Sequence, residues 1–328
     1  MSGKLRLSLA CGDYELTRPL IEGAVRPDGI ELTVLSAAGS RERHWRMARH
    51  QEYDACEFNC CAYFAARDRG FPWTAIPVYC HRRFRHGFVF VNTAKGIKKP
   101  SDLIGRKVGG TNFQPAGSVW IRGILEEHFG VPHKEIAWFT DREEDIEFTP
   151  GPGLKIERIP PGKTLDQMLA EGELDAMISP NFPRPFLQSD PRVARLFPDY
   201  KKAEQEYFQR TGIFPIMHVT VVRQEIIDQH PWVAASLARA FQQAKQIAYA
   251  RVRNPRVVPL AWFSAAWEEQ TALLGRDPWA YGLGPANRKT LETAIRYAHQ
   301  QSLIGRPIPV DELFVKTDDE EIGDKGHI

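Results

Sequence analysis

The sequence has almost no net charge and no long apolar run. Its 43 Lys and Arg residues are nearly balanced by 41 Asp and Glu residues, which leaves a formal net charge of +2. Proteins that bind nucleic acid or membrane surfaces usually carry a large basic excess, so this balance argues against both classes. No stretch approaches the roughly 18 uninterrupted apolar residues of a transmembrane helix. Any cationic function in this chain must therefore be local.

Cysteine is scarce, and its number is odd. All five cysteines lie in the first quarter of the chain, at Cys11, Cys56, Cys60, Cys61 and Cys80. This count favours reduced thiols over a disulfide framework, and the spacing matches no structural zinc pattern. Residues 4–10 alternate between apolar and polar as in a strand, whereas a signal peptide has a continuous apolar segment. We therefore expect a cytoplasmic protein without a metal site.

Several common motifs are also missing. The sequence contains no P-loop, no Gly-x-Gly-x-x-Gly fingerprint and no Gly-x-Ser-x-Gly elbow, which disfavours nucleotide binding and acyl hydrolysis. What is present is an ordinary globular composition, with 43% hydrophobic residues in 328. This length is large for one hydrophobic core and suits two lobes.

The predicted elements alternate between strands and helices, which favours a mostly parallel sheet. The first group has strands at 4–10, 30–35, 54–58 and 73–79, with helices at 40–50 and 62–69. The second has strands at 106–110, 154–159 and 176–178, with helices at 115–129 and 165–170. Three longer helices are predicted at 231–250, 262–274 and 287–301.

Two further β runs, 88–92 and 215–222, flank the second group and are predicted to be hinge strands. This places residues 1–90 and 218–328 in one discontinuous lobe and residues 91–217 in an inserted lobe, with a ligand cleft between them. The segments Glu52–Glu57 and Glu173–Ile178 share a short motif, in which Asp-Ala leads into a predicted strand. Ligands of open α/β sheets bind beyond the carboxyl ends of strands, which draws attention to Asn59 and Asn181.

A cationic cluster precedes the first hinge strand. His81, Arg82, Arg83, Arg85 and His86 fall within six residues. Because the apolar run that follows must be buried, we expect this cluster at the end of a strand, where it can bind an anion. Arginine forks suit carboxylates, and histidine suits proton transfer near neutral pH. The alternative is that these side chains are solvated, paired with acids or packed in the core.

The sequence resembles the 4,5-dihydroxyphthalate decarboxylase family, an enzyme branch of the type II periplasmic-binding-protein fold that also includes nitrate, sulfonate and thiamine-precursor binding proteins. The matching phrases span about residues 5 to 250, and they are Leu9–Tyr14, Thr17–Leu20, Ala75–Val78, Phe84–His86, Asp102–Gly109, Val119–Leu125 and Thr211–His218. The resemblance implies a two-lobed α/β fold with two hinge strands and a C-terminal helical section. It also implies cofactor-free decarboxylation of a hydroxylated aromatic (di)carboxylate by ring protonation.

The candidate site residues follow from the chemistry and from these phrases. His86 and His218 are the predicted catalytic acids. The predicted substrate-binding residues are Arg83, Arg85, Asp13, Tyr14, Glu57, Asn59, Thr111, Asn112, Gln114 and Asn181. The turn at 111–114 precedes a helix whose free N–H groups would favour an anion. For Asp13 the simpler reading is a helix cap, and for Glu57 it is pairing with an arginine.

Two other functions stay open on the sequence alone. The same cleft could serve a solute-binding protein of an ABC-type uptake system for a small anion, without chemistry. Where the decarboxylases tend to read Pro-Glu-Tyr-Gln, this chain has Thr111–Gln114, which keeps another small-acid enzyme of the same fold open. The expected partner is a small aromatic carboxylate, or a small anion if the chain is a solute-binding protein, and not nucleic acid. A homo-oligomer is possible on the sequence.

Overall fold

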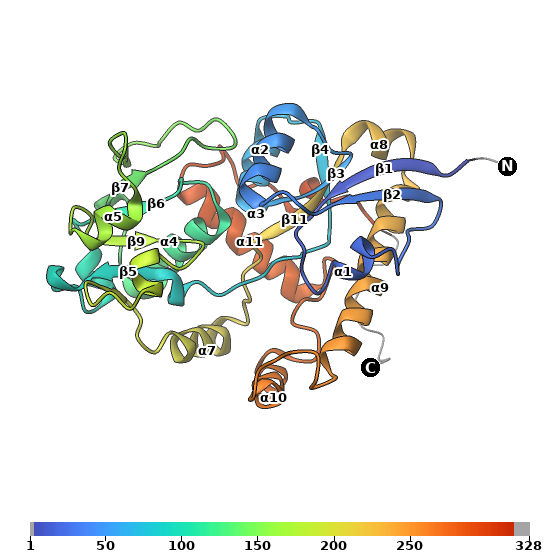
Figure 1. Ribbon diagram of the computed structural model, residues 1–328. Coiled ribbons are helices and arrows are strands. Elements are labelled where there is room, and N and C mark those ends of the chain that lie inside the picture. Colours follow the sequence, from blue (N-terminus) through green and yellow to red (C-terminus); the bar gives the residue numbers. More distant parts are fainter. Residues whose placement is uncertain (1–2, 318–328) are drawn as a thin grey trace. The chain divides into compact units, whose positions relative to one another are not determined.

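The computed structural model describes residues 3–317, and the chain divides into two compact units (Figure 1). Unit 1 holds the described residues up to Arg82, then Ile216–Glu292 and the segment from Ile308. Unit 2 holds Arg83–Pro215 and Thr293–Pro307. These units differ from the predicted lobes at residues 83–90, 216–217 and 293–307, all of which the sequence interpretation placed in the opposite lobe.

Unit 1 is built on a five-stranded sheet in the order β2-β1-β3-β11-β4. The strands are β1 (Leu5–Ala10), β2 (Ile30–Leu35), β3 (Ala55–Asn59), β4 (Trp73–Ile76) and β11 (His218–Arg223). β1 pairs in parallel with both β2 and β3, whereas β11 runs antiparallel to β3 and β4. Every residue of β3 is buried, as expected for a central strand with both faces covered.

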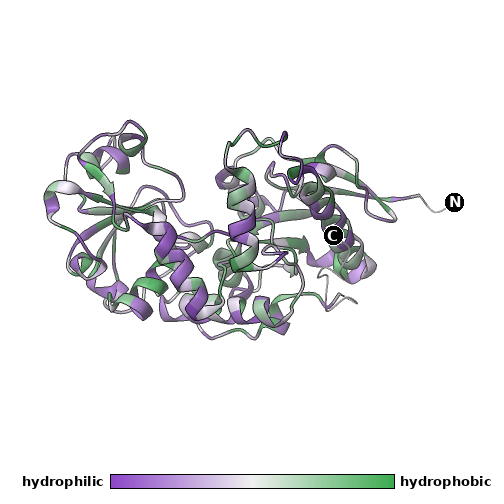
Figure 2. Cartoon of the chain, turned by 90° about the horizontal axis from the view of Figure 1, so that it is seen from below, coloured by the Kyte–Doolittle hydropathy of each residue, from purple (hydrophilic) through white to green (hydrophobic). Residues whose placement is uncertain are grey.

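Unit 1 also contains seven α-helices of its own within residues 3–317. They are α1 (Arg18–Ile21), α2 (Ser40–His50), α3 (Cys60–Asp68), α8 (Gln224–Gln229), α9 (Trp232–Val252), α10 (Phe263–Leu274) and α12 (Val310–Leu313). Figure 2 shows hydrophilic and hydrophobic residues along the same helices, the pattern of helices that pack on one side only. Among residues 3–317, no helix is long and apolar enough to cross a membrane.

Unit 2 is built on a six-stranded sheet in the order β10-β5-β9-β6-β7-β8. The strands are β5 (Val89–Asn92), β6 (Lys107–Gly110), β7 (Ala137–Thr140), β8 (Lys155–Arg158), β9 (Ala176–Ile178) and β10 (Val193–Arg195). The α-helices are α4 (Ala116–Phe129), α5 (Leu165–Ala170), α6 (Arg184–Leu187) and α7 (Tyr200–Thr211), with 3-10 turns η1 (His86–Phe88), η2 (Thr93–Lys95), η3 (Pro100–Leu103) and η4 (His133–Glu135). Its core gathers Phe90, Leu165, Leu169 and Leu174.

Helix α11 (Pro285–Gln300) contributes to both units, which the sequence did not reveal. Its C-terminal half packs against α4. Tyr297 lies so close to Gly123 that a Cβ there would be 2.3 Å from the ring, and Arg122 Nε donates to Gln301 Oε1 at 2.7 Å. These contacts explain why residues 293–307 belong to unit 2.

Both sheets contain a topological switch point, where the chain leaves a central strand on one side and returns on the other. In unit 1, β1 lies between β2 and β3, and in unit 2, β6 lies between β7 and β9. Asp54 accepts the N–H of Ser8 at 2.8 Å, and Asp175 accepts that of Lys107 at 2.8 Å. The aspartate of each Asp-Ala motif therefore bonds the neighbouring strand of its sheet in the same way. Ligands of open α/β sheets bind at such points, beyond the carboxyl ends of the strands.

The residues of the cationic cluster precede β5, which begins at Val89. The chain makes a single bridge between Arg82 and Ile216 and then the turn η1, so Arg83, Arg85 and His86 do not lie on a strand. His218, by contrast, is the first residue of β11.

Candidate active site

The carboxylate of Glu57 is completely buried in unit 1 and accepts four hydrogen bonds. Its Oε1 receives the Nδ1–H of His218 at 2.5 Å and the hydroxyl of Tyr14 at 3.0 Å. Its Oε2 receives the backbone N–H of Gly12 at 2.7 Å and an Nη2–H of Arg43 at 2.8 Å. An ionised carboxylate offers about four acceptor positions, so this one is saturated with donors.

Strand register brings Glu57 and His218 together. In the antiparallel pair of β3 and β11, Thr220 lies opposite Glu57 and His218 lies opposite Asn59. Residues two apart on a strand share a face, so His218 is the diagonal neighbour of Glu57 on the same face. Long side chains reach across such diagonals, and this reach allows the short contact.

The remaining donors come from the segment after β1 and from α2. A Cβ at Gly12 would lie 2.3 Å from Cζ of Tyr14, so only glycine leaves room for the tyrosine ring to reach Glu57. Thr17 fixes this turn, because its hydroxyl donates to the carbonyl of Gly12 at 2.6 Å. Arg43 is buried on α2 and also donates to the carbonyl of Ala38 at 3.0 Å.

The electrostatics keep Glu57 ionised. Burial by itself would raise the pKa of this carboxyl, but the charge and hydrogen bond of His218, the charge of Arg43 and the Gly12 N–H outweigh it and hold the pKa below its ordinary range. Burial, together with the Glu57 charge, raises the pKa of Cys11 to about 12 and also raises that of Tyr14. The thiol and phenol are therefore neutral at neutral pH, and the carboxylate carries the negative charge of the cluster.

Two more histidines border this cluster. The ring of His218 meets the rings of His44 and His81 edge to face, with centroids 4.9 and 4.8 Å apart. Tyr14 lies 6.0 Å from His81. Because Nδ1 of His218 is held by Glu57, its Nε2 is the nitrogen left for proton transfer. A carboxylate that orients an imidazole and stabilises its cation is the arrangement that general acid–base catalysis uses.

Two predicted residues of unit 1 do not join the cluster. Asp13 is exposed and pairs with Arg18 at 3.1 Å. Asn59 is buried, and its Oδ1 accepts the N–H groups of Cys61 and Ala62 as the cap of α3. The structure therefore gives Asp13 and Asn59 local roles. Asp13 does not cap a helix either, because α1 begins at Arg18 with Thr17 before it.

In unit 2, the guanidinium of Arg85 lies beside the first turn of α4. A Cβ at Gly117 would be 2.7 Å from Cζ of Arg85, so glycine permits this approach. Burial, followed by the charge of Arg83, lowers the pKa of Arg85 to about 9. A buried cation beside the positive end of a helix gives a locally positive environment at the edge of this sheet.

His86 is buried in unit 2 and is surrounded by aromatic rings. The centroids of Phe197 and Tyr207 lie 5.3 and 5.5 Å from its ring. Burial, followed by the charges of His128 and Arg210, lowers the pKa of His86 to about 4. A histidine that is neutral at neutral pH makes a poor proton donor, so the structure argues against His86 as the catalytic acid.

The predicted anion site at 111–114 holds a carboxylate of the chain itself. Glu144 accepts the backbone N–H groups of Phe113 at 2.6 Å and Gln114 at 2.9 Å. The side chain of Gln114 bonds the backbone of Ile146, and Oδ1 of Asn112 accepts from Arg142 at 3.1 Å. Thr111 donates its hydroxyl to Asn112, and Asn181 is exposed after β9. These contacts fix the loop that follows β7.

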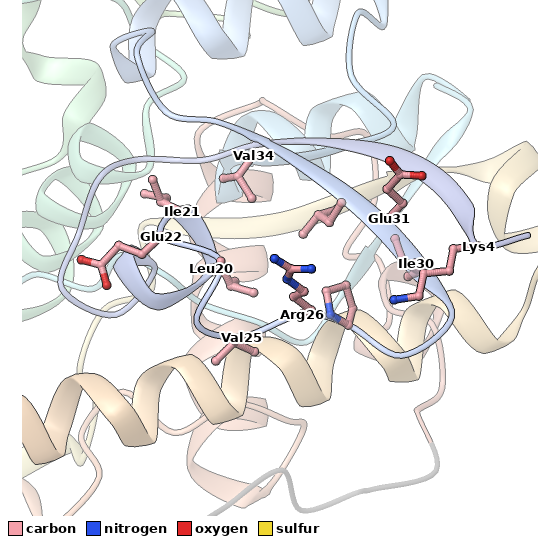
Figure 3. Close-up of a pocket in the computed structure, with 12 residues that line it drawn as sticks. Lys4, Leu20, Ile21, Glu22, Val25, Arg26, Ile30, Glu31 and Val34 are labelled. Carbon is pink, nitrogen blue, oxygen red and sulfur yellow. The ribbon is translucent and has the colours of Figure 1, made fainter.

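Two surface cavities lie away from the Glu57 cluster. One in unit 1, of about 240 Å³, is lined by Leu20, Val25, Arg26 and Ile30 among others (Figure 3). Another in unit 2, of about 340 Å³, is lined by Lys95, Lys107 and Asp175. Neither contains a residue of the Glu57 cluster. Among residues 3–317, no group of three or more His, Cys, Asp and Glu side chains is arranged to hold a metal ion.

Sequence reasoning missed Arg43 and His44. Both lie on α2, which also carries Arg41, Arg46 and Arg49 and resembles a solvated cationic helix. A signal was nevertheless present, because Arg43, His44 and Met47 recur at the spacing of one helical face. His81 was considered less favourable as an acid than the other two histidines, yet it lies against His218.

The two sheets and their switch points define a periplasmic-binding-protein-like α/β fold, as predicted. The periplasmic aliphatic sulphonate binding protein SsuA of Escherichia coli has the same fold, with a TM-score of 0.52 and 11% identity over 96% of this chain and 98% of that one. The family described as NMT1/THI5 like matches residues 27–139.

The particular family follows from closer relatives. A 4,5-dihydroxyphthalate decarboxylase of Comamonas testosteroni is 34% identical over 95% of this chain and 96% of its own length. A 4,5-dihydroxyphthalate decarboxylase of Pseudomonas putida is 34% identical over 63% of this chain and 82% of its own length. The chain belongs to the 4,5-dihydroxyphthalate decarboxylase family, which confirms the resemblance found in the sequence.

Proposed function

We propose that this protein is a carboxy-lyase that releases CO2 from 4,5-dihydroxyphthalate or a close hydroxylated aromatic dicarboxylate. The observation that carries the proposal is the saturated Glu57–His218 pair in a chain that aligns with such a decarboxylase over 95% of its length. The pair supplies an oriented imidazole, and the family supplies the substrate class. A cytoplasmic location and independence of cofactors remain predictions.

The proposed reaction protonates the ring at the carbon that carries a carboxylate. The hydroxyl para to this carbon supplies electron density, and the new C–H bond forms with a proton from Nε2 of His218. The bond to the carboxylate carbon then breaks, CO2 leaves, and the electron pair restores the aromatic ring. The product from 4,5-dihydroxyphthalate is 3,4-dihydroxybenzoate, and His218 regains its proton from water.

Glu57 is proposed to act through His218. As a carboxylate held ionised by its donors, it accepts the Nδ1–H and stabilises the imidazolium that gives up the Nε2 proton. Tyr14 and the Gly12 N–H hold the carboxylate in place from the β1 side. A positioned acid typically contributes 10²–10⁴-fold to a rate, which sets the scale of the losses expected in variants.

Arg85 and Arg83 are proposed as ligands of the carboxylate that is retained. The position of Arg85 beside the first turn of α4 supports this role, because both groups favour an anion. We do not extend the proposal to Asp13, Asn59, Asn112 and Gln114, whose polar groups already serve local structure, nor to Thr111 and Asn181.

The test is the release of CO2 and of 3,4-dihydroxybenzoate by the purified full chain, before and after dialysis against a chelator. We expect turnover in both samples. His218→Asn keeps a donor toward Glu57 but lacks the transferable proton, so it should lower kcat about 100-fold or more while KM changes little. His50→Asn, at an exposed helix end, is the matched control. A wild-type protein that binds the acid without releasing CO2 would overturn the proposal.

A further inference from the structure

Aromatic rings and arginines gather around Phe88 in unit 2. The rings of Phe88 and Phe182 stack with centroids 5.3 Å apart and planes 6° apart. The guanidinium carbons of Arg83 and Arg85 lie 5.2 and 5.3 Å from the centroid of Phe88. That of Arg195 lies 5.3 Å from the centroid of Phe182. Guanidinium groups favour the faces of aromatic rings, so these contacts stabilise one another's positions.

Phe182 differs from the buried phenylalanines of this chain, because 41% of its surface is exposed. It follows β9, whose carboxyl end lies at the switch point with β6. Core phenylalanines such as Phe58 and Phe113 are at most 1% exposed. An exposed ring that is fixed by stacking, at the edge where such sheets bind ligands, offers a flat apolar surface.

Arg83 provides a cation over Phe88, the ring on which Phe182 stacks. It is exposed, and within residues 3–317 its side chain makes no hydrogen bond or ion pair, although it lies over the ring of Phe88. Its backbone N–H donates to the carbonyl of Pro215 at 3.1 Å, which fixes the main chain there. The guanidinium fork is therefore available to a carboxylate, for which its geometry is suited.

We propose that Phe182 and Arg83 form a recognition subsite for an aromatic carboxylate. The aromatic ring of the ligand packs against the exposed part of Phe182, and its carboxylate receives the fork of Arg83. This inference rests on the proposed function and adds to it a basis for selection. Planar aromatic acids gain the stacking interaction, whereas saturated ring acids with the same carboxylates gain only the ion pair.

The experiment compares two probes by isothermal titration calorimetry with the full wild-type chain. Phthalate is planar, and cis-cyclohexane-1,2-dicarboxylate carries the same carboxylates on a saturated ring. We expect phthalate to bind about three- to tenfold more tightly, the factor that one aromatic stack provides. Phe182→Leu should bring the ratio of the two dissociation constants close to one, and Phe182→Tyr should preserve it. Arg83→Gln should weaken both probes by similar factors.

Leu187→Ala is the matched control, because Leu187 is an exposed apolar residue on the neighbouring α6 with 64% of its surface exposed. It should leave the ratio unchanged. The subsite is overturned if the wild-type protein fails to bind phthalate or binds both probes equally, or if Phe182→Leu keeps the preference. Binding that follows the expected pattern while 4,5-dihydroxyphthalate yields no CO2 would support the subsite and overturn the proposed decarboxylation.

Discussion

His218 donates its Nδ1–H to a carboxylate oxygen of Glu57 at 2.5 Å, across 161 positions of sequence. The two residues meet because β11 returns antiparallel to β3 after the segment Arg83–Pro215 of unit 2 has been inserted between them. Each residue comes from a central strand, so neither can move without disturbing the sheet. The pair is therefore a rigid element, and rigid support is what a general acid requires.

Glu57→Gln should abolish most of the activity. A glutamine amide can place its NH2 toward Nδ1 of His218 and favour the tautomer that carries the proton on Nε2 without a stabilising negative charge. We expect kcat to fall at least about 100-fold with a smaller change in KM. Glu52→Gln, which removes an exposed carboxylate paired with Arg46, should leave kcat unchanged. Wild-type kcat in Glu57→Gln would exclude Glu57 from the mechanism.

Arg43→Met should destabilise unit 1 as well as slow turnover. The variant leaves Glu57 buried without its arginine partner, and breaking a buried ion pair typically costs about 3–5 kcal/mol. Urea unfolding would measure the loss of free energy of unfolding. Arg41→Met, at an exposed position of the same helix, is the control and should stay within about 0.5 kcal/mol. Equal stability of the two variants would contradict the role of Arg43.

Gly12→Ala tests the position of Tyr14. The new methyl would lie 2.3 Å from Cζ of Tyr14, and the far end of this side chain moves more readily than the backbone. The hydroxyl should leave Glu57, and kcat should fall about as far as it does in Tyr14→Phe. Gly39→Ala introduces the same methyl where nothing lies within 4 Å, so it should be neutral. A normal Gly12→Ala enzyme beside an impaired Tyr14→Phe enzyme would refute the steric argument.

Gly117→Ala should act on Arg85 in unit 2. The added Cβ would lie 2.7 Å from the guanidinium carbon, which must then swing away from the first turn of α4. We expect KM to rise about tenfold while kcat changes less, because a ligand of the retained carboxylate contributes mainly to binding. Steady-state kinetics with 4,5-dihydroxyphthalate measures both constants. A fall in kcat alone would assign Arg85 to the chemical step instead.

The sequence predicted the parts of the site better than their assembly. The structure brings the predicted residues Tyr14, Glu57 and His218 into one cluster, and each follows or lies within a recognisable strand-end motif. Their convergence depends on the register of β3 against β11, which no local pattern encodes. The sequence analysis did not identify Arg43, because helix periodicity does not show which arginine of a cationic helix faces a buried carboxylate.

For the fold, too, local elements were predicted well and long-range contacts were not. The range 40–50 was predicted for α2 without error, and the Asp-Ala phrases located β3 and β9. The hinge strand predicted at 88–92 begins at Val89, because the chain first makes the turn η1 over His86–Phe88. The split of α11 between the units follows from contacts with α4, more than 160 positions earlier, such as the hydrogen bond of Arg122 to Gln301.

His86 gives a pH dependence of stability with a defined sign. Its pKa is about 4 in the folded chain and about 6.5 when unfolded, so the unfolded state binds more protons between these values. Stability is therefore complete above pH 6.5 and is lost as the pH falls toward 4, by up to about 3 kcal/mol. Glu204 acts in the opposite sense, because burial raises its pKa to about 7 and its contribution weakens as the pH rises.

His86→Phe separates these two effects, because phenylalanine fits among Phe129, Phe197 and Tyr207 and does not titrate. We expect the variant to lose less stability than the wild-type protein between pH 7.5 and pH 5, as measured by urea unfolding at both values. Turnover should be retained, since His86 is not the proposed acid. If the two proteins lose equal stability, then His86 is not held neutral by its surroundings. If turnover disappears in a folded His86→Phe protein, the acid has been assigned to the wrong histidine.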